Sequence, residues 1–145
     1  MTYFIILTLH LLCAIIFIGT VFFEVLFLRH IEKRLPKDVM QSLGTAVGGR
    51  AKQLMPWVLL VLFGTGISMG YFHSAAFKQG IMNSHFTILF SIKILLAISV
   101  LIHFISAMIL RKKGLLKGKV SHHIHTSVFC HVLLIAILAK AMFYL

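Results

Sequence analysis

The sequence predicts an all-α integral membrane protein built as a bundle of four transmembrane helices. Of its 145 residues, 60% are hydrophobic, and the mean hydropathy is +1.03, which is too apolar for a soluble domain of this size. Four apolar runs each reach the ~20 residues that a helix needs to cross a ~30 Å hydrocarbon core. The runs lack the alternation of barrel strands, so helices are the predicted spanning form. We expect a single transmembrane domain over residues 1–145.

The first run has no basic segment before it and no small-residue cleavage site after it, so it is expected to be a retained helix rather than a secretion signal. Pro56 is expected in the first turn of the second helix, where proline is tolerated. The connection before it contains "LGTAVGGR" and is predicted to be flexible, whereas the short connection before the fourth run makes the last two helices antiparallel neighbours. The predicted helices are about 3–28, 54–72, 86–110 and 124–145.

The formal charge of +11 is concentrated in two of the three connections. Basic loops stay in the cytoplasm, so both termini are predicted outside, in the periplasm, and the protein in the inner (cytoplasmic) membrane as a multi-pass chain. This placement assigns the charge to topology and to contact with anionic membrane lipid, and it argues against a nucleic-acid partner. The basic residues of the two loops are Arg29, Lys33, Arg34, Lys37, Arg50 and Lys52, then Arg111, Lys112, Lys113, Lys117 and Lys119.

Ionisable residues within the spans are costly and usually mark a site. His10 lies on the first span, Lys93 and His103 on the third, and His131 on the fourth. A rise of ~1.5 Å per residue places His10 and Lys93 in an outer layer, with His103 and His131 in an inner layer about 15 Å away. Serines flank both inner histidines, because Ser99 precedes His103 by four residues and Ser127 precedes His131 by four.

Histidines on facing helices with aromatic surroundings suit a non-covalent b-type haem, and the chain has 13 phenylalanines and no CxxCH motif. We predict His103 and His131 as an axial pair, and His10 as the ligand of a second haem or the partner of Lys93. Lys93 is a candidate partner of a propionate. Such a protein would carry electrons to or from a quinone or a redox protein.

Weaker metal candidates lie near the ends of the spans. His122 and His125 are three residues apart at the start of the fourth run, and His73 and His85 flank the connection between the second and third runs. These side chains are expected to be solvated or lipid-facing more often than metal-bound. Two alternatives to haem stay open. One is a copper-handling protein in which His10, Cys13 and methionines form a soft path; the other is a cofactor-free membrane assembly subunit.

Three segments resemble the small four-helix HemJ-like and CopD-like membrane proteins: "LHLLCAIIFIGTVFFEVLFLRH", "VLLVLFGTGISMG" and "FSIKILLAISVLIHF". The resemblance to HemJ-like proteins implies a haem-b-binding oxidase of protoporphyrinogen IX in which His10 and Lys93 hold the important positions. The resemblance to CopD-like proteins implies copper handling. The chain departs from the HemJ-like pattern before the fourth helix, where "SHHIHTS" stands in place of an acidic residue. The sequence leaves a homo-oligomer open.

Overall fold

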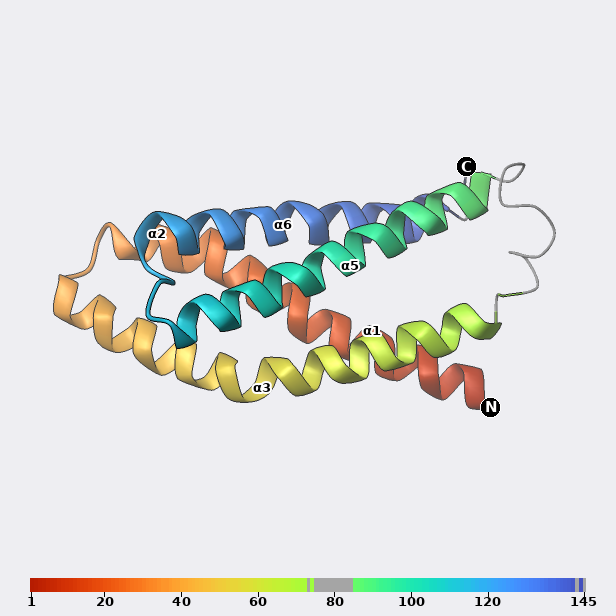
Figure 1. The fold of residues 1–145 in the computed structure, drawn as a ribbon, viewed down its shortest axis with the longest axis horizontal. Coiled ribbons are helices and arrows are strands. Elements are labelled where there is room, and N and C mark those ends of the chain that lie inside the picture. The colour runs from red at the N-terminus through yellow and green to blue at the C-terminus, as the bar shows by residue number, and fades with distance from the viewer. Residues whose placement is uncertain (73, 75–84, 143, 145) are drawn as a thin grey trace. The chain divides into compact units, whose positions relative to one another are not determined.

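A computed structural model describes residues 1–72, 74, 85–142 and 144, and this part of the chain is helical apart from its connections (Figure 1). Four stretches are long and apolar enough to cross a membrane: Thr2–Glu32, Lys37–Phe72, His85–Lys112 and Gly118–Ala141. The all-α prediction and the number of candidate spans are therefore confirmed for the described residues. The elements are α1 (Thr2–Phe22), the π-helix η1 (Phe23–Leu28), α2 (Arg29–Glu32), α3 (Lys37–Phe72), α5 (His85–Lys112) and α6 (Gly118–Ala141).

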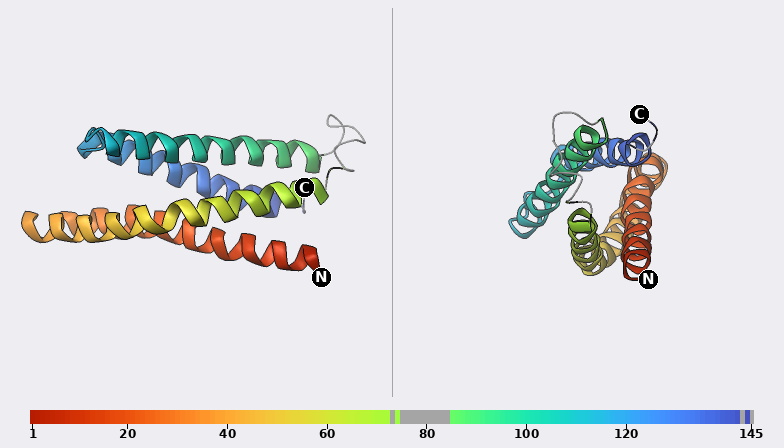
Figure 2. Two further views of the ribbon diagram at one scale, coloured as in Figure 1. Left: turned by 60° about the horizontal axis from the view of Figure 1, so that its bottom comes forward. Right: turned by 90° about the vertical axis from the view of Figure 1, so that its right-hand side faces the viewer.

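The chain divides into two compact units, Met1–Ser74 and Ala75–Leu145. Each unit is a helical hairpin: α1 packs against α3 in the first, and α5 packs against α6 in the second. The two helices of each hairpin run in opposite directions (Figure 2). The prediction that the last two spans are antiparallel neighbours is thus confirmed.

The first hairpin differs from the expected boundaries on both sides of its turn. The first helix does not end near residue 28, because η1 and α2 continue it to Glu32. The turn is short, and Pro36 precedes α3, where its carbonyl accepts a hydrogen bond from the Met40 amide over 3.0 Å. Proline cannot continue a preceding helix, so it separates the two helices of this hairpin.

The expectation of a flexible connection over residues 29–53 was wrong, because α3 begins at Lys37 and runs for 36 residues. At ~1.5 Å per residue it is about 54 Å long, well beyond a ~30 Å hydrocarbon core. Side-chain hydroxyls bond main-chain carbonyls in its first turns, where Ser42 donates to the Asp38 carbonyl and Thr45 to the Gln41 carbonyl. Pro56 consequently lies in the interior of α3 rather than in its first turn.

The second hairpin turns at Gly114, whose φ of +69° favours glycine. The amide of Leu115 donates to the Leu110 carbonyl over 2.9 Å, which closes the end of α5 in a Schellman-type arrangement. The fourth helix begins at Gly118, six residues before the expected start, so the histidine-rich stretch "SHHIH" is helical.

Few of the described residues are buried. Large apolar side chains are exposed on all four long helices, as contact with membrane lipid requires. In the second hairpin the interior includes Val100, Val128 and Val132, of which Val100 and Val132 are only 3% exposed.

Candidate functional site

The second hairpin brings two predicted ligands together. His103 on α5 and His131 on α6 are both partly buried, and their ring centroids are 5.3 Å apart with planes inclined by 51°. This separation places the two imidazoles at one level of the hairpin, in agreement with the inner layer that the sequence predicts.

Each imidazole is tied to a serine of the opposite helix. Ser99 Oγ of α5 lies 3.1 Å from His131 Nε2 of α6, and Ser127 Oγ of α6 lies 3.0 Å from His103 Nε2 of α5. The other ring nitrogens bond within their own helices: His103 Nδ1 is 2.7 Å from the Ser99 carbonyl oxygen, and His131 Nδ1 is 2.7 Å from the Ser127 carbonyl oxygen. These four residues form a closed ring of hydrogen bonds, called the Ser–His ring below.

The hydrogen bonds assign the tautomer of both neutral rings. A carbonyl oxygen can only accept, so Nδ1 of His103 and of His131 must carry the proton. Nε2 then holds the lone pair and accepts the serine hydroxyl proton. The same bonds fix ring orientation, since a histidine that donates its second N–H to a main-chain carbonyl is held as metal-binding histidines usually are.

A short repeat underlies this arrangement. The α5 segment "SVLIH" (99–103) matches the α6 segment "SVFCH" (127–131) at the serine, the following valine and the histidine. Because α5 and α6 are antiparallel, equal spacing of serine and histidine places each serine opposite the other helix's histidine. Aligning the sequence on the two histidines shows this repeat.

The surroundings of the Ser–His ring are apolar and carry no negative charge from its own helices. Val100 and Val128 follow the two serines and are buried. Neither α5 nor α6 contains an aspartate or glutamate, and the last acidic residue of the chain is Asp38. The charged side chains of the two helices are all basic: Lys93, Arg111 and Lys112 on α5, and Lys119 and Lys140 on α6.

The Ser–His ring bears on the predicted haem between His103 and His131. An axial pair holds its iron from opposite faces of a macrocycle, which must then pass between the two rings. Here each imidazole makes a direct hydrogen bond to a serine of the opposite helix, so a macrocycle between the rings would have to displace both bonds. Haem at this pair stays a prediction.

His10 is held in the first hairpin by α3. Its Nδ1 lies 3.0 Å from the Leu62 carbonyl oxygen and 3.1 Å from Thr65 Oγ1. Thr65 Oγ1 itself donates to the Val61 carbonyl over 2.7 Å, so both groups accept from the Nδ1–H of His10. A Cβ built on Gly66 would lie 3.3 Å from Cε1 of His10, which explains why a residue without a side chain packs there.

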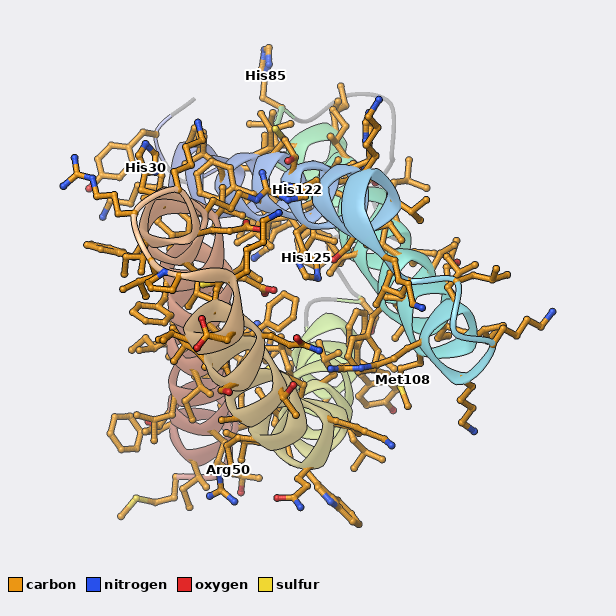
Figure 3. All side chains as sticks on the ribbon, turned by 90° about the vertical axis from the view of Figure 1, so that its left-hand side faces the viewer. His30, Arg50, His85, Met108, His122 and His125 are labelled. Carbon is orange, nitrogen blue, oxygen red and sulfur yellow. The ribbon has the colours of Figure 1, made fainter. Side chains whose placement is uncertain are left out.

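The remaining predicted site residues do not join these groups. Lys93 is partly buried on α5 in the second unit, whereas His10 belongs to the first unit. His122 and His125 lie on the first turns of α6, and His85 projects away from its hairpin (Figure 3). His73 lies outside the described residues. Among those that the structure describes, no group of three or more histidine, cysteine or acidic side chains is placed to hold a metal ion.

No protein-family model, curated protein or solved structure matches this chain. The resemblance to HemJ-like and CopD-like proteins therefore stays a prediction.

Proposed function

We propose that this chain is a multi-pass membrane protein that binds and handles monovalent copper, with the ion held in the second hairpin by Nε2 of His103 and Nε2 of His131. The observation that carries the proposal is the pair of imidazoles whose Nδ1–H groups are both anchored to main-chain carbonyls. Anchoring leaves Nε2 as the coordinating nitrogen on each ring and holds it from a rigid helix.

The ring separation supports a small ion at this place. Two imidazoles bound on opposite sides of one ion, with metal–nitrogen distances of about 2 Å, have centroids about 6 Å apart. The observed separation is 5.3 Å, which is close to this value, and each Nε2 would have to turn from its serine towards the ion. A single ion therefore requires much smaller movements of α5 and α6 than a macrocycle does.

Charge favours Cu(I) over a divalent metal. Imidazole binds copper, zinc, iron and nickel ions, so donor type alone does not select among them. With two neutral ligands and no carboxylate on α5 or α6, a divalent ion would bring two uncompensated charges into an apolar interior, where charge is costly. Cu(I) brings one, and it accepts a coordination sphere of only two nitrogens.

The placement of basic residues supports an inner (cytoplasmic) membrane location with both termini in the periplasm. The turn of each hairpin, together with the helix ends beside it, is rich in lysine and arginine, and basic segments are retained in the cytoplasm. In this orientation the Ser–His ring lies within the span, between the two surfaces of the membrane.

Metal binding under reducing conditions tests the proposal. The protein, purified in detergent, is loaded anaerobically with Cu(I), desalted and titrated with a chromogenic Cu(I) chelator. We expect stoichiometric Cu(I) that withstands desalting and is lost from a His103→Ala/His131→Ala variant. A wild-type protein that retains no copper, or a double variant that retains as much as the wild type, contradicts the proposal.

A second candidate function, binding of haem b, is favoured by the geometry at His10. Its Nδ1–H is donated to α3, so Nε2 is the ring nitrogen that carries the lone pair, and Gly66 gives the ring room to lie against that helix. When bound, a haem would supply one-electron chemistry. A Soret band after expression with added haem, lost in His10→Ala and retained in His131→Ala, supports this candidate. A colourless protein rejects it.

A further inference from the structure

We infer that Ser99 and Ser127 are exchangeable caps on the copper site, an inference that rests on the proposed function. In the metal-free protein each hydroxyl occupies one Nε2, and on metal binding each returns to a carbonyl of its own helix. The two serines are thus positioning residues that set how readily the imidazoles accept the ion.

These two serines behave unlike several other hydroxyls of the described helices. Those serines and threonines donate to the carbonyl four residues before their own. Ser99 and Ser127 instead reach the opposite helix. The intrahelical pattern is seen for Thr8, Thr20, Ser42, Thr45, Ser68, Ser91 and Thr126.

The intrahelical alternative exists for both caps. Leu95 lies four residues before Ser99, and His123 lies four residues before Ser127, so rotation about the Cα–Cβ bond turns each hydroxyl towards one of these carbonyls. A carbonyl oxygen has two lone pairs and can accept a side chain in addition to the helix amide. A serine that leaves Nε2 therefore still has an acceptor, and this acceptor is a carbonyl that the helix amide already satisfies.

The caps also serve Nε2 itself. A partly buried nitrogen with no partner loses its solvation, so the metal-free site needs the caps. Once the ion is bound, the lone pair is used and the cap is no longer needed. The serine hydroxyl consequently competes with the metal for the lone pair of Nε2 and does not stabilise the bound ion. Removing the hydroxyl should therefore favour the metal-bound state.

The test measures Cu(I) affinity by chelator competition in Ser99→Ala, Ser127→Ala and the double variant. Each alanine is expected to raise affinity by about three- to twenty-fold, the range that the measured strength of hydrogen bonds between membrane helices implies. Ser91→Ala on α5 is the matched control, because Ser91 donates to the Thr87 carbonyl and does not reach α6; its affinity should equal that of the wild type. Ser99→Thr and Ser127→Thr keep the hydroxyl and should return affinity to near the wild-type value.

The outcomes separate this inference from the proposed function. If the wild type binds no Cu(I), both fall. If it binds Cu(I) but the alanine variants match it, the cap inference alone is overturned. A lower affinity in the alanine variants also overturns it, because the serines would then support the bound ion. If an alanine variant fails to fold, the two threonine variants serve as the test. A Cu(I) affinity in either of them that differs strongly from the wild-type value contradicts the inference.

Discussion

His103 and His131 face each other across the α5–α6 hairpin with ring centroids 5.3 Å apart, and each ring accepts a hydroxyl from the helix that carries the other. The relationship is reciprocal, because a serine four residues before a histidine occurs on both antiparallel helices. A pair of neutral imidazoles results, with every ring nitrogen in a hydrogen bond. This pair is the proposed copper site.

Removing either imidazole should abolish copper binding. His103→Ala and His131→Ala each leave one nitrogen ligand, and we expect affinity to fall by more than about 100-fold, beyond the 10–100-fold loss typical of an outer-shell partner. Chelator competition measures the change. His123→Ala is the control, because this exposed histidine of α6 bonds the Lys119 carbonyl of its own helix. Equal losses in all three variants would point to general damage rather than to a site.

The Ser–His ring should also stabilise the hairpin when no metal is present. His131→Leu removes an inter-helix bond, and we expect the free energy of unfolding to fall by about 0.6–1.7 kcal/mol. His131→Leu/Ser99→Ala should cost clearly less than the sum of the two single changes, because both partners of one inter-helix hydrogen bond are removed together. Thermal unfolding of the copper-free protein in detergent measures this. Costs that add to within about 0.5 kcal/mol would contradict coupling between Ser99 and His131.

The close approach at Gly66 should make this position intolerant of side chains. A Cβ there lies 3.3 Å from Cε1 and 3.7 Å from Nδ1 of His10, so Gly66→Val must displace the ring and weaken its bond to Leu62. We expect a loss of about 1–3 kcal/mol. Gly70→Val on the same helix is the matched control, because a Cβ at Gly70 meets nothing within 4 Å. Equal melting temperatures for the two variants would show that His10 is not packed as described.

The proposed topology predicts which segments thiol reagents reach. With Cys13 and Cys130 replaced by alanine, a cysteine introduced as Lys113→Cys should react with a membrane-impermeant maleimide only after cells are opened. Thr2→Cys should react in intact spheroplasts. Basic turns retained in the cytoplasm are the physical reason. Labelling of Lys113→Cys in intact spheroplasts would invert the assigned orientation.

The sequence predicts much of the fold because each membrane span requires a continuous apolar run of about 20 residues. Four runs and one short basic connection were enough for the candidate spans and for the pairing of α5 with α6. The first half of α3 was missed, because glycines such as Gly44 and Gly49 disfavour a helix locally by about 1 kcal/mol each. Packing beyond the apolar segment is not visible in hydropathy, so the 36-residue length of α3 could not be foreseen.

The candidate site was predictable in its residues and not in its chemistry. Helix direction and rise place His103 near His131, and the structure brings them together. Which ring nitrogen carries the proton depends on Nδ1 bonds to the carbonyls of Ser99 and Ser127. Side-chain directions of that kind do not follow from residue spacing alone. The bonds of both Nε2 atoms to serines were likewise not expected, since composition favoured a haem between the rings.

X-ray absorption at the copper edge of the Cu(I)-loaded wild-type protein tests the central claim most directly. If His103 and His131 hold the ion, we expect a first shell of nitrogen at about 2 Å with the outer-shell scattering of two imidazole rings. This signal should be lost in His103→Ala/His131→Ala. A first shell dominated by sulfur at about 2.3 Å would place copper on cysteine or methionine side chains. That result, or a protein that carries no copper, would contradict the account.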